Sequence, residues 1–559
     1  LAPWLLIAML AVAYAAASLT SHTALFHDDG LYLATAESLA AGDGYRIASL
    51  PGHPPQTKYP FLYPAVLAAL WRWPAVFKPL SAICTALWVW AVWTLARRNG
   101  LDAQRAAWVS LAAVAGRWAL FIFTAVLPDA LFCVLSTVAL LHLMNIEDRS
   151  PPSRWWFWPA LAAIECGAAF LTRTVGAALI LAGLVALGSR RRIREALLFG
   201  ALAGAVCLPW IAWQRSQPAP QDPVLAYYSK ASYQQGSLLT QPGLDRKAAV
   251  LGVNAAMLGS SFHVLVNTPF GWVGAALGLV LLIPLAIETT ARLRAMSAAA
   301  LWLVISMLVL AGWLGPPFRY VLPVLPIAAI FVALRLREWP RASLALATLV
   351  AIASLTTLVG AAKSLHAGRP VSWMPAELDD PAATARLYDW IRRNTPSDAV
   401  LAANNDPQIH LETHRPAIRL FASDNFELLY SNHGGGVGTA DDLIENLDRH
   451  HVRYLLLTPM NGFAEGAAFR RILPQVASRC PGRFALRYQD REPGYAIIEV
   501  APVCEPSSSP QTPPGIPASF SRSVETRPPA HRYRGATASP IQSSSSPYSR
   551  PSPTPAPSL

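Results

Sequence analysis

The stretch that decides the fold class is residues 77–98, FKPLSAICTALWVWAVWTLARR, in which an apolar run ends in two arginines. A helix that crosses a bilayer needs about 20 mostly apolar residues, and the run from Phe77 to Leu95 meets that length. Cytoplasmic loops of membrane proteins carry an excess of Lys and Arg. The stretch therefore predicts a membrane span, with Arg97 and Arg98 at its cytoplasmic end.

The composition of the whole chain has the same character. Its 559 residues are 53% hydrophobic and only 14% charged, whereas soluble globular chains carry about a quarter charged residues. The net charge is +12, but the cations stand in short clusters between apolar runs, which argues against a nucleic-acid partner. The six cysteines form no CxxC pair or Cys/His cluster. A zinc scaffold is thereby excluded, and we expect neither a metal nor a cofactor.

Further apolar runs predict a polytopic α-helical membrane protein with about eleven spans. They lie near Pro3–Leu19, Phe77–Leu95, Ala106–Val126, Asp129–Ile146, Trp155–Leu171, Thr174–Leu187, Ala196–Trp213, Phe270–Ile287, Ala298–Leu314, Tyr320–Leu334 and Ala342–Ala361. The first run, with its AYAAAS sequence, also resembles a signal peptide. On either interpretation residues 20–76 lie outside.

Every alternate loop is basic, which predicts a cytoplasmic N-terminus and an external C-terminus. The inner residues are Arg97, Arg98, Arg105, Arg149, Arg154, Arg190, Arg191, Arg192, Arg194, Arg292, Arg294, Arg335, Arg337 and Arg341. Residues 1–362 form the predicted transmembrane module, with long outer loops at 20–76 and 214–269. For a bacterial inner membrane, the outer side is the periplasm.

Residues 363–504 have the composition of a soluble α/β domain on the outer side. AATARLYDWIRRNTP predicts a helix, DAVLAAN and VRYLLLTP predict buried strands, and RFALRYQ with GYAIIEVA predicts a closing hairpin. Cys480 and Cys504 bracket the hairpin, and both a disulfide and two free thiols are compatible with the sequence. QIHLETHRP, which holds His410 and His414, is typical of a strand and turn and so argues against zinc. Residues 505–559 are Ser/Pro-rich and are expected to be disordered.

The predicted topology brings six ionisable residues from four connections to the outer face. They are Asp28, Asp29, Lys58, Asp129, Arg173 and Arg319. Charged groups at membrane depth are costly and therefore functional candidates. Adjacent carboxylates raise each other's proton affinity, so the Asp28–Asp29 pair suits a general base near neutral pH. The alternative is that either aspartate only begins the helix Leu31 to Ala40.

The other candidates also carry alternatives. Lys58 and Tyr59 lie in the aromatic stretch KYPFLYP, where the lysine either binds a phosphate or reaches lipid headgroups. Asp129 follows Pro128 at a predicted helix start, so its alternative role is to cap that helix. Arg173 in FLTRTVGAA must find an anion or face lipid phosphates, and we expect it to hold a donor phosphate together with Lys58. The remaining candidates are Arg319 with Tyr320 in GPPFRYVLPVLP, and Arg117 inside the third span, which either snorkels or points into a polar cavity.

A carboxylate pair among several cations suits displacement at a sugar carbon whose leaving group is a lipid phosphate. The phosphate leaves as a stable anion, so Arg or Lys stabilises the developing charge and no general acid is required. The acceptor hydroxyl needs a base, which one Asp supplies. Attack opposite the leaving group inverts the anomeric configuration.

The order of HDDGLYLATAESLA, GDGYR, KYPFLYPAVLAALW, LPDALF, LTRTVGAAL and FRYVLPVLP resembles the GT-C superfamily of polyprenyl-phosphate-sugar glycosyltransferases. The resemblance covers about residues 1–340 and is closest to family 39, the protein O-mannosyltransferase type, and to the similar lipid A aminoarabinose transferases. It implies that Asp28 is the base and that Lys58 binds the donor phosphate. The second acidic residue is Asp29 here, where family members more often have Glu.

The resemblance implies a polyprenyl-phosphate sugar donor and a glycan, lipid or protein acceptor, with the lipid bilayer as the surroundings. The competing class is a transporter or lipid flippase without covalent chemistry. Such proteins usually show paired half-repeats with broken helices near the midplane, and no internal symmetry of that kind is evident in this sequence.

Overall fold

The computed structural model describes residues 2–20, 23–24, 27–148, 155–232, 238–261, 271–313, 318–368, 380–403, 405–421, 426, 430, 438–458, 464–480 and 482–502. Cys504 and the predicted tail, 505–559, lie outside the described residues, as does the side chain of Arg117.

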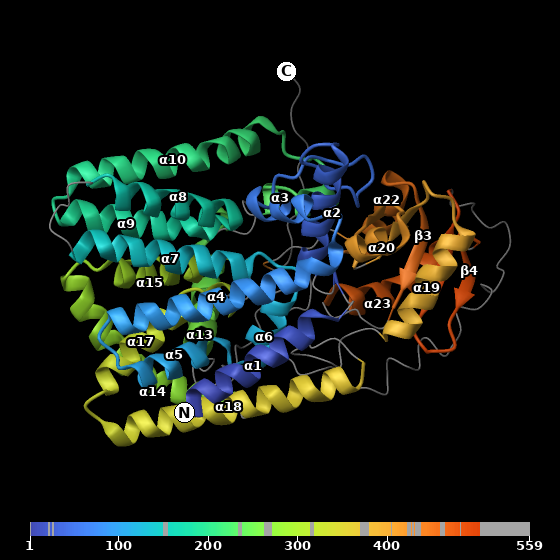
Figure 1. The fold of residues 1–559 in the computed structure, drawn as a ribbon. Helices are drawn as coiled ribbons and strands as arrows, with labels where there is room; N and C mark the ends of the chain where they lie inside the picture. The colour runs from blue at the N-terminus through green and yellow to red at the C-terminus, as the bar shows by residue number, and fades with distance from the viewer. Residues whose placement is uncertain are drawn as a thin grey trace, which may run out of the picture.

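The first two thirds of the chain are helical (Figure 1). The α-helices are α1 (Ala2–Ser18), α2 (Asp28–Ala41), α3 (Leu62–Ala69), α4 (Phe77–Arg98), α5 (Ala103–Val114), α6 (Arg117–Thr124), α7 (Asp129–Asp148), α8 (Phe157–Thr172), α9 (Ala177–Ser189), α10 (Ile193–Ser216), α11 (Pro223–Tyr227), α13 (Leu244–Ser261), α14 (Gly271–Arg294), α15 (Ala298–Ala311), α16 (Phe318–Val321), α17 (Leu325–Leu336) and α18 (Pro340–His366). Short 3-10 turns occur at η1 (Pro74–Val76), η2 (Thr174–Gly176) and η3 (Leu238–Thr240).

Several of these helices are apolar enough for a bilayer. Four of the described helices have the length and composition to cross it, namely Pro74–Arg98, Asp129–Glu147, Ile193–Ser216 and Pro340–His366. Counting the sharply bent pairs α5–α6 and α14–α15 as one span each gives up to 6, and four further apolar helices are shorter. The structure therefore supports several spans, and the number eleven stays a prediction.

Helix ends beside several of the described basic turns contact one another. Arg98 donates from Nη1 to Asn145 Oδ1 (2.8 Å), and Arg292 donates from Nη1 to Asn99 Oδ1 (2.7 Å). These bonds join the ends of α4, α7 and α14, which the sequence assigns to one side of the membrane. The predicted span Ala106–Val126 is in fact broken into α5 and α6, because Ala115 and Gly116 between them leave the helix.

The last third is an α/β unit with a five-stranded sheet of order β2-β1-β3-β5-β4. Its elements are α19 (Pro381–Asn394), β1 (Val400–Ala402), α20 (Asp406–Thr413), β2 (Ala417–Ile418), α22 (Ala440–Arg449), β3 (Val452–Leu457), α23 (Ala464–Arg479), β4 (Phe484–Gln489) and β5 (Ala496–Val500). β1 pairs parallel with β2 and β3, whereas β5 pairs antiparallel with β3 and β4. The predicted helix, strands and closing hairpin are all present.

Side chains alternate between the two faces of this sheet, as a strand requires. Tyr454 and Leu456 pack with α19, while Leu455 and Leu457 belong to the core on the opposite face, which includes residues of α22 and α23. Cys480, at the end of α23, is disulfide-bonded.

The structure corrects the prediction for QIHLETHRP, because residues 406–413 form the helix α20 rather than a strand. Pro407 lies at the start of the helix, where its fixed φ and missing N–H are tolerated. The helix ends at His414, whose φ of 55° is left-handed. His410 points its Nε2 at Glu37 Oε2, 2.9 Å away in α2.

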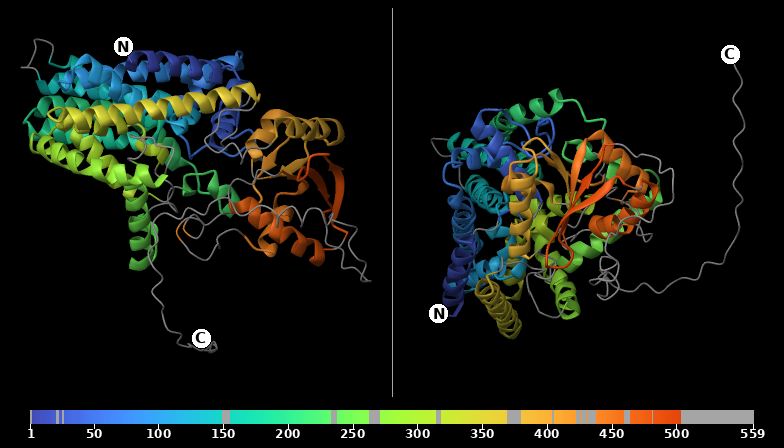
Figure 2. Two further views of the ribbon diagram at one scale, coloured as in Figure 1. Left: turned by 90° about the horizontal axis from the view of Figure 1, so that it is seen from below. Right: turned by 90° about the vertical axis from the view of Figure 1, so that its right-hand side faces the viewer.

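The α/β unit docks beside α2 at one end of the helical bundle (Figures 1 and 2). The Ala417 N–H donates to the Ser49 carbonyl (2.8 Å), and His27 Nε2 lies 2.9 Å from Asp406 Oδ1. Gly30 of α2 allows the close approach, since a Cβ at this position would lie 2.7 Å from Pro407 Cβ. Residues of the segment 20–76 and of the α/β unit are therefore in direct contact.

Candidate functional site

Asp28 is the first residue of α2, but its carboxylate does not cap the helix. Its Oδ1 accepts a 2.6 Å hydrogen bond from Tyr59 Oη, and its Oδ2 accepts a 2.7 Å bond from Arg319 Nη1. The preceding residue, His27, has a φ of 22°. The side chain of Asp28 is 23% exposed, so a substrate can reach it.

Arg319 joins Asp28 to a second aspartate. Its Nε donates to both oxygens of Asp129 (3.0 and 2.9 Å), and its Nη2 donates to Asp129 Oδ2 (2.7 Å). Arg173 Nη1 also donates to Asp129 Oδ1, and its guanidinium lies 4.5 Å from the ring centroid of Tyr320. Asp129 does begin α7, but its carboxylate binds these two arginines. The two aspartates and two arginines form a cluster with no net charge.

The ionisation of Asp28 differs from the prediction that a neighbouring carboxylate raises its pKa. Burial does favour the protonated acid, but Arg319, Lys58 and the Tyr59 hydrogen bond outweigh burial and lower the pKa of Asp28 to about 2. Asp28 is therefore ionised at physiological pH. Opposite charges and hydrogen bonds to the carboxylate, rather than the Asp29 charge, set this value.

Lys58 lies next to Tyr59, with its Nζ 5.5 Å from the centroid of the Tyr59 ring. Its Nζ donates to the Tyr227 carbonyl (2.9 Å) and lies 3.8 Å from the centroid of the Tyr227 ring. A hydrogen bond fixes the backbone here, because the Lys58 N–H donates to Gln56 Oε1 (2.8 Å). Burial lowers the pKa of Lys58 to about 8, and Arg419 adds to the effect while Asp28 opposes it. The lysine is a buried cation that interacts electrostatically with the Asp28 carboxylate.

Among the predicted residues, Asp29 has described contacts outside this cluster. Asp29 is buried, accepts the Gly30 N–H at 3.0 Å and interacts electrostatically with Lys78 of α4. Arg117 begins α6, and its side chain lies outside the described residues. The other predicted residues lie within one site: Asp28, Lys58, Tyr59, Asp129, Arg173, Arg319 and Tyr320.

Sequence reasoning missed three neighbours of the site. Tyr227 ends α11 in the second outer loop, Arg419 follows β2, and Asp406 of α20 contacts His27. The adjacent tyrosines at 227 and 228 were a weak signal, and nothing in the sequence around Arg419 distinguishes it. Within the described residues, no group of three His, Cys, Asp or Glu side chains is arranged to hold a metal.

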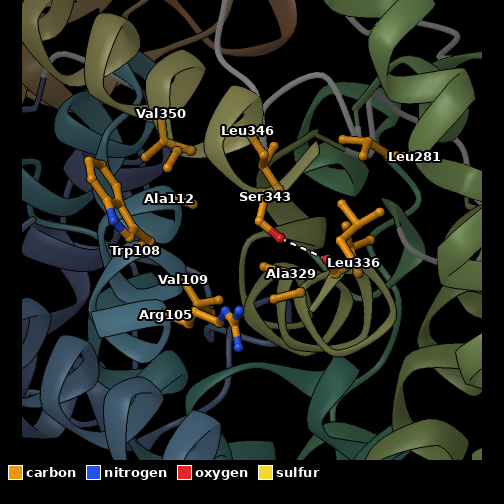
Figure 3. Close-up of a pocket in the computed structure, with 13 residues that line it drawn as sticks. Arg105, Trp108, Val109, Ala112, Leu281, Ala329, Leu336, Ser343, Leu346 and Val350 are labelled. Carbon is orange, nitrogen blue, oxygen red and sulfur yellow. Dashed lines mark hydrogen bonds between the residues drawn. The ribbon is translucent and has the colours of Figure 1, made fainter. Parts of the chain in front are cut away.

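The structure also contains an apolar pocket between α5, α14, α17 and α18 (Figure 3). Ser343 donates to the Leu336 carbonyl across one side of it (2.8 Å). Its one ionisable lining residue among those described is Arg105, in the first turn of α5. The pocket shares no residue with the Asp28 cluster and lacks the groups needed for proton transfer.

Comparison with known proteins identifies the fold. No protein-family model and no curated protein matches the sequence. The structure is similar to that of ArnT from Cupriavidus metallidurans bound to undecaprenyl phosphate, with a TM-score of 0.56 and 16% identity over 91% of this chain and 100% of that chain. The apo form of that protein aligns with a TM-score of 0.55 and 14% identity, over 89% of this chain and 97% of that chain. The chain has the fold of ArnT.

This GT-C fold agrees with the family resemblance of the sequence motifs. The archaeal oligosaccharyltransferase AglB from Archaeoglobus fulgidus, in complex with an inhibitory peptide and a dolichol-phosphate, aligns with a TM-score of 0.49 and 13% identity. That alignment covers 88% of this chain and 74% of AglB.

Proposed function

We propose that the protein is a membrane glycosyltransferase that transfers a sugar from a polyprenyl-phosphate donor to an acceptor hydroxyl. The reaction takes place on the outer face of a bacterial inner membrane, with the N-terminus in the cytoplasm and the α/β unit in the periplasm. The acceptor is a glycan, lipid or protein. The GT-C fold and the undecaprenyl phosphate bound to ArnT support the lipid-linked donor.

The observation that carries the proposal is the geometry around Asp28. An ionised and partly exposed carboxylate lies at the junction of α2, α7 and α16, beside the buried cation Lys58. This arrangement offers a proton acceptor and a phosphate-binding group in one place. A transporter requires neither group to be held so close to the other.

The proposed step is a single displacement. The acceptor oxygen bonds to the anomeric carbon, the bond from that carbon to the phosphate oxygen breaks, and the polyprenyl phosphate leaves as an anion. Asp28 takes the hydroxyl proton. Because its pKa is low, Asp28 accepts the proton late, when the oxygen has already begun to bond to carbon and has become acidic. Attack from the face opposite the phosphate inverts the anomeric configuration.

The other residues take separate roles. Lys58 contacts the donor phosphate and stabilises its developing charge. Arg319 fixes both Asp28 and Asp129, so we assign it the orientation of the base. Arg173 is neutralised by Asp129 and stacks on Tyr320, which favours a positioning role over direct contact with the phosphate. Tyr59 orients Asp28 through its hydroxyl.

The experiment compares wild type with Asp28→Asn in lipid nanodiscs, using radiolabelled undecaprenyl-phosphate sugars and a membrane extract as acceptor. Asp28→Asn should lower transfer by about 10²–10⁴-fold, the usual contribution of a positioned general base. Asp43→Asn is the matched control, because Asp43 lies exposed in the same outer loop. Unchanged transfer in Asp28→Asn would refute the assignment of the base. Donor binding or translocation without transfer by wild type would favour the transporter alternative.

A further inference from the structure

Arg419 brings a second cation to the Lys58 side of the site, although it belongs to the α/β unit. Its guanidinium carbon lies 3.9 Å from the centroid of the Tyr227 ring, and Lys58 Nζ lies 3.8 Å from the same centroid. Both residues are almost fully buried, at 6% and 7% exposure. Two cations from distant parts of the chain therefore converge on one tyrosine.

Two buried positive charges at such close quarters repel each other, and cation–π contact with one ring offsets only part of that repulsion. Burial is the main cause of the lowered pKa of Lys58, and the charge of Arg419 lowers that pKa further. Asp28 and Asp406 act on Lys58 in the opposite direction. An anion bound by both cations would relieve this repulsion.

The backbone of Arg419 is held from both sides of the contact. Its N–H donates to Tyr228 Oη at 3.1 Å, and its carbonyl accepts from Asn446 Nδ2 at 3.0 Å. Two residues earlier, the Ala417 N–H donates to the Ser49 carbonyl. The arginine is thus fixed before any ligand arrives, which reduces the entropy lost on binding.

The geometry points to Arg419 as a donor-phosphate ligand that acts together with Lys58, so that the α/β unit completes the donor site. The planar guanidinium offers paired N–H groups that match two phosphate oxygens, whereas the lysine acts as a point charge. This inference rests on the proposed function and extends it: the catalytic module alone would hold only one of the two cations. The Tyr227 ring contacts both cations.

The test measures the affinity of the full chain for undecaprenyl phosphate in phosphatidylcholine nanodiscs by native mass spectrometry. Arg419→Gln, which keeps a long polar side chain, should weaken affinity at least about tenfold, the effect of losing one charge-assisted contact. Arg419→Lys should retain part of it. Arg453→Ala is the control, because Arg453 is an exposed arginine of the same sheet. Undecaprenol, which lacks the phosphate, should bind all variants equally.

Three outcomes separate this inference from the proposed function. Wild-type affinity in Arg419→Gln together with weakened binding in Lys58→Ala would overturn the role of Arg419 and leave the glycosyltransferase proposal intact. Equal wild-type affinity for undecaprenol and undecaprenyl phosphate would overturn both. Inorganic phosphate provides the last comparison: if it competes with the lipid in wild type but not in Arg419→Gln, the arginine binds the phosphate group itself.

Discussion

Asp129→Asn should destabilise the protein strongly, because Asp129 balances two buried arginines. Its carboxylate accepts three hydrogen bonds from Arg319, at 3.0, 2.9 and 2.7 Å, and one more from Arg173. The arginine side chains are only 6% and 9% exposed, and that of Asp129 is 4% exposed. With Asp28, the four side chains sum to zero charge, so the substitution leaves one uncompensated buried positive charge.

Breaking a buried ion pair in this way costs about 3–5 kcal/mol. If a helical module of about 360 residues unfolds cooperatively with about 2.1 cal/mol/K per residue, the midpoint temperature falls by about 4–7 °C. Thermal unfolding in nanodiscs, followed by tryptophan fluorescence, measures the shift. Glu445→Gln is the control, since its pair with Arg449 is exposed and is worth at most about 1 kcal/mol.

A double substitution separates the lost charge balance from a general packing defect. Asp129→Asn with Arg173→Gln removes one charge of each sign, so it should be less destabilised than the sum of the two single variants by about 1 kcal/mol or more. A wild-type midpoint for Asp129→Asn would refute the reasoning. Strict additivity of the two substitutions would refute the coupling between Asp129 and Arg173.

Three further predictions follow from other contacts. The affinity of the protein for undecaprenyl phosphate should fall as the pH rises through about 8, because Lys58 then loses its charge. The variant Lys58→Arg should keep its affinity for the lipid above that pH. A wild-type affinity that does not change with pH would contradict this prediction. The stability that the Asp28 charge contributes should be fully present above the ordinary pKa of 3.8 and lost as the pH falls towards about 2. The free energies of unfolding of wild type and Asp28→Asn, measured against pH, should therefore converge near pH 2. Curves that stay parallel would exclude this contribution. Gly30→Val should weaken the packing of α2 against Pro407 by about 1–3 kcal/mol. Proteolysis between the helical module and the α/β unit should then be faster. Unaltered cleavage would show that this packing does not hold the two parts together.

The local elements were predictable because each depends on a short pattern. Apolar runs with arginines at one end located α4, α7, α10 and α18, and a short apolar run located β3 as a buried strand. The break between α5 and α6 was not predicted, because apolar residues continue on both sides of Gly116 and Arg117 was interpreted as a charge within one continuous span. The helix α20 was mistaken for a strand because its short sequence has little periodicity, and the contacts of Pro407 and His410 with α2 stabilise it.

By itself the sequence predicted which residues lie on each side of the membrane, and hence that Asp28, Lys58, Asp129, Arg173 and Arg319 share one face. Sidedness follows from chain order and the positions of basic loops. Only the tertiary structure decided the pairing: that Arg319 joins Asp28 to Asp129, that the pKa of Asp28 is lowered rather than raised, and that Arg419 reaches Tyr227 from the α/β unit. Pairing and ionisation depend on distances of a few ångströms between groups hundreds of residues apart, because Coulomb and hydrogen-bond energies change steeply over that range.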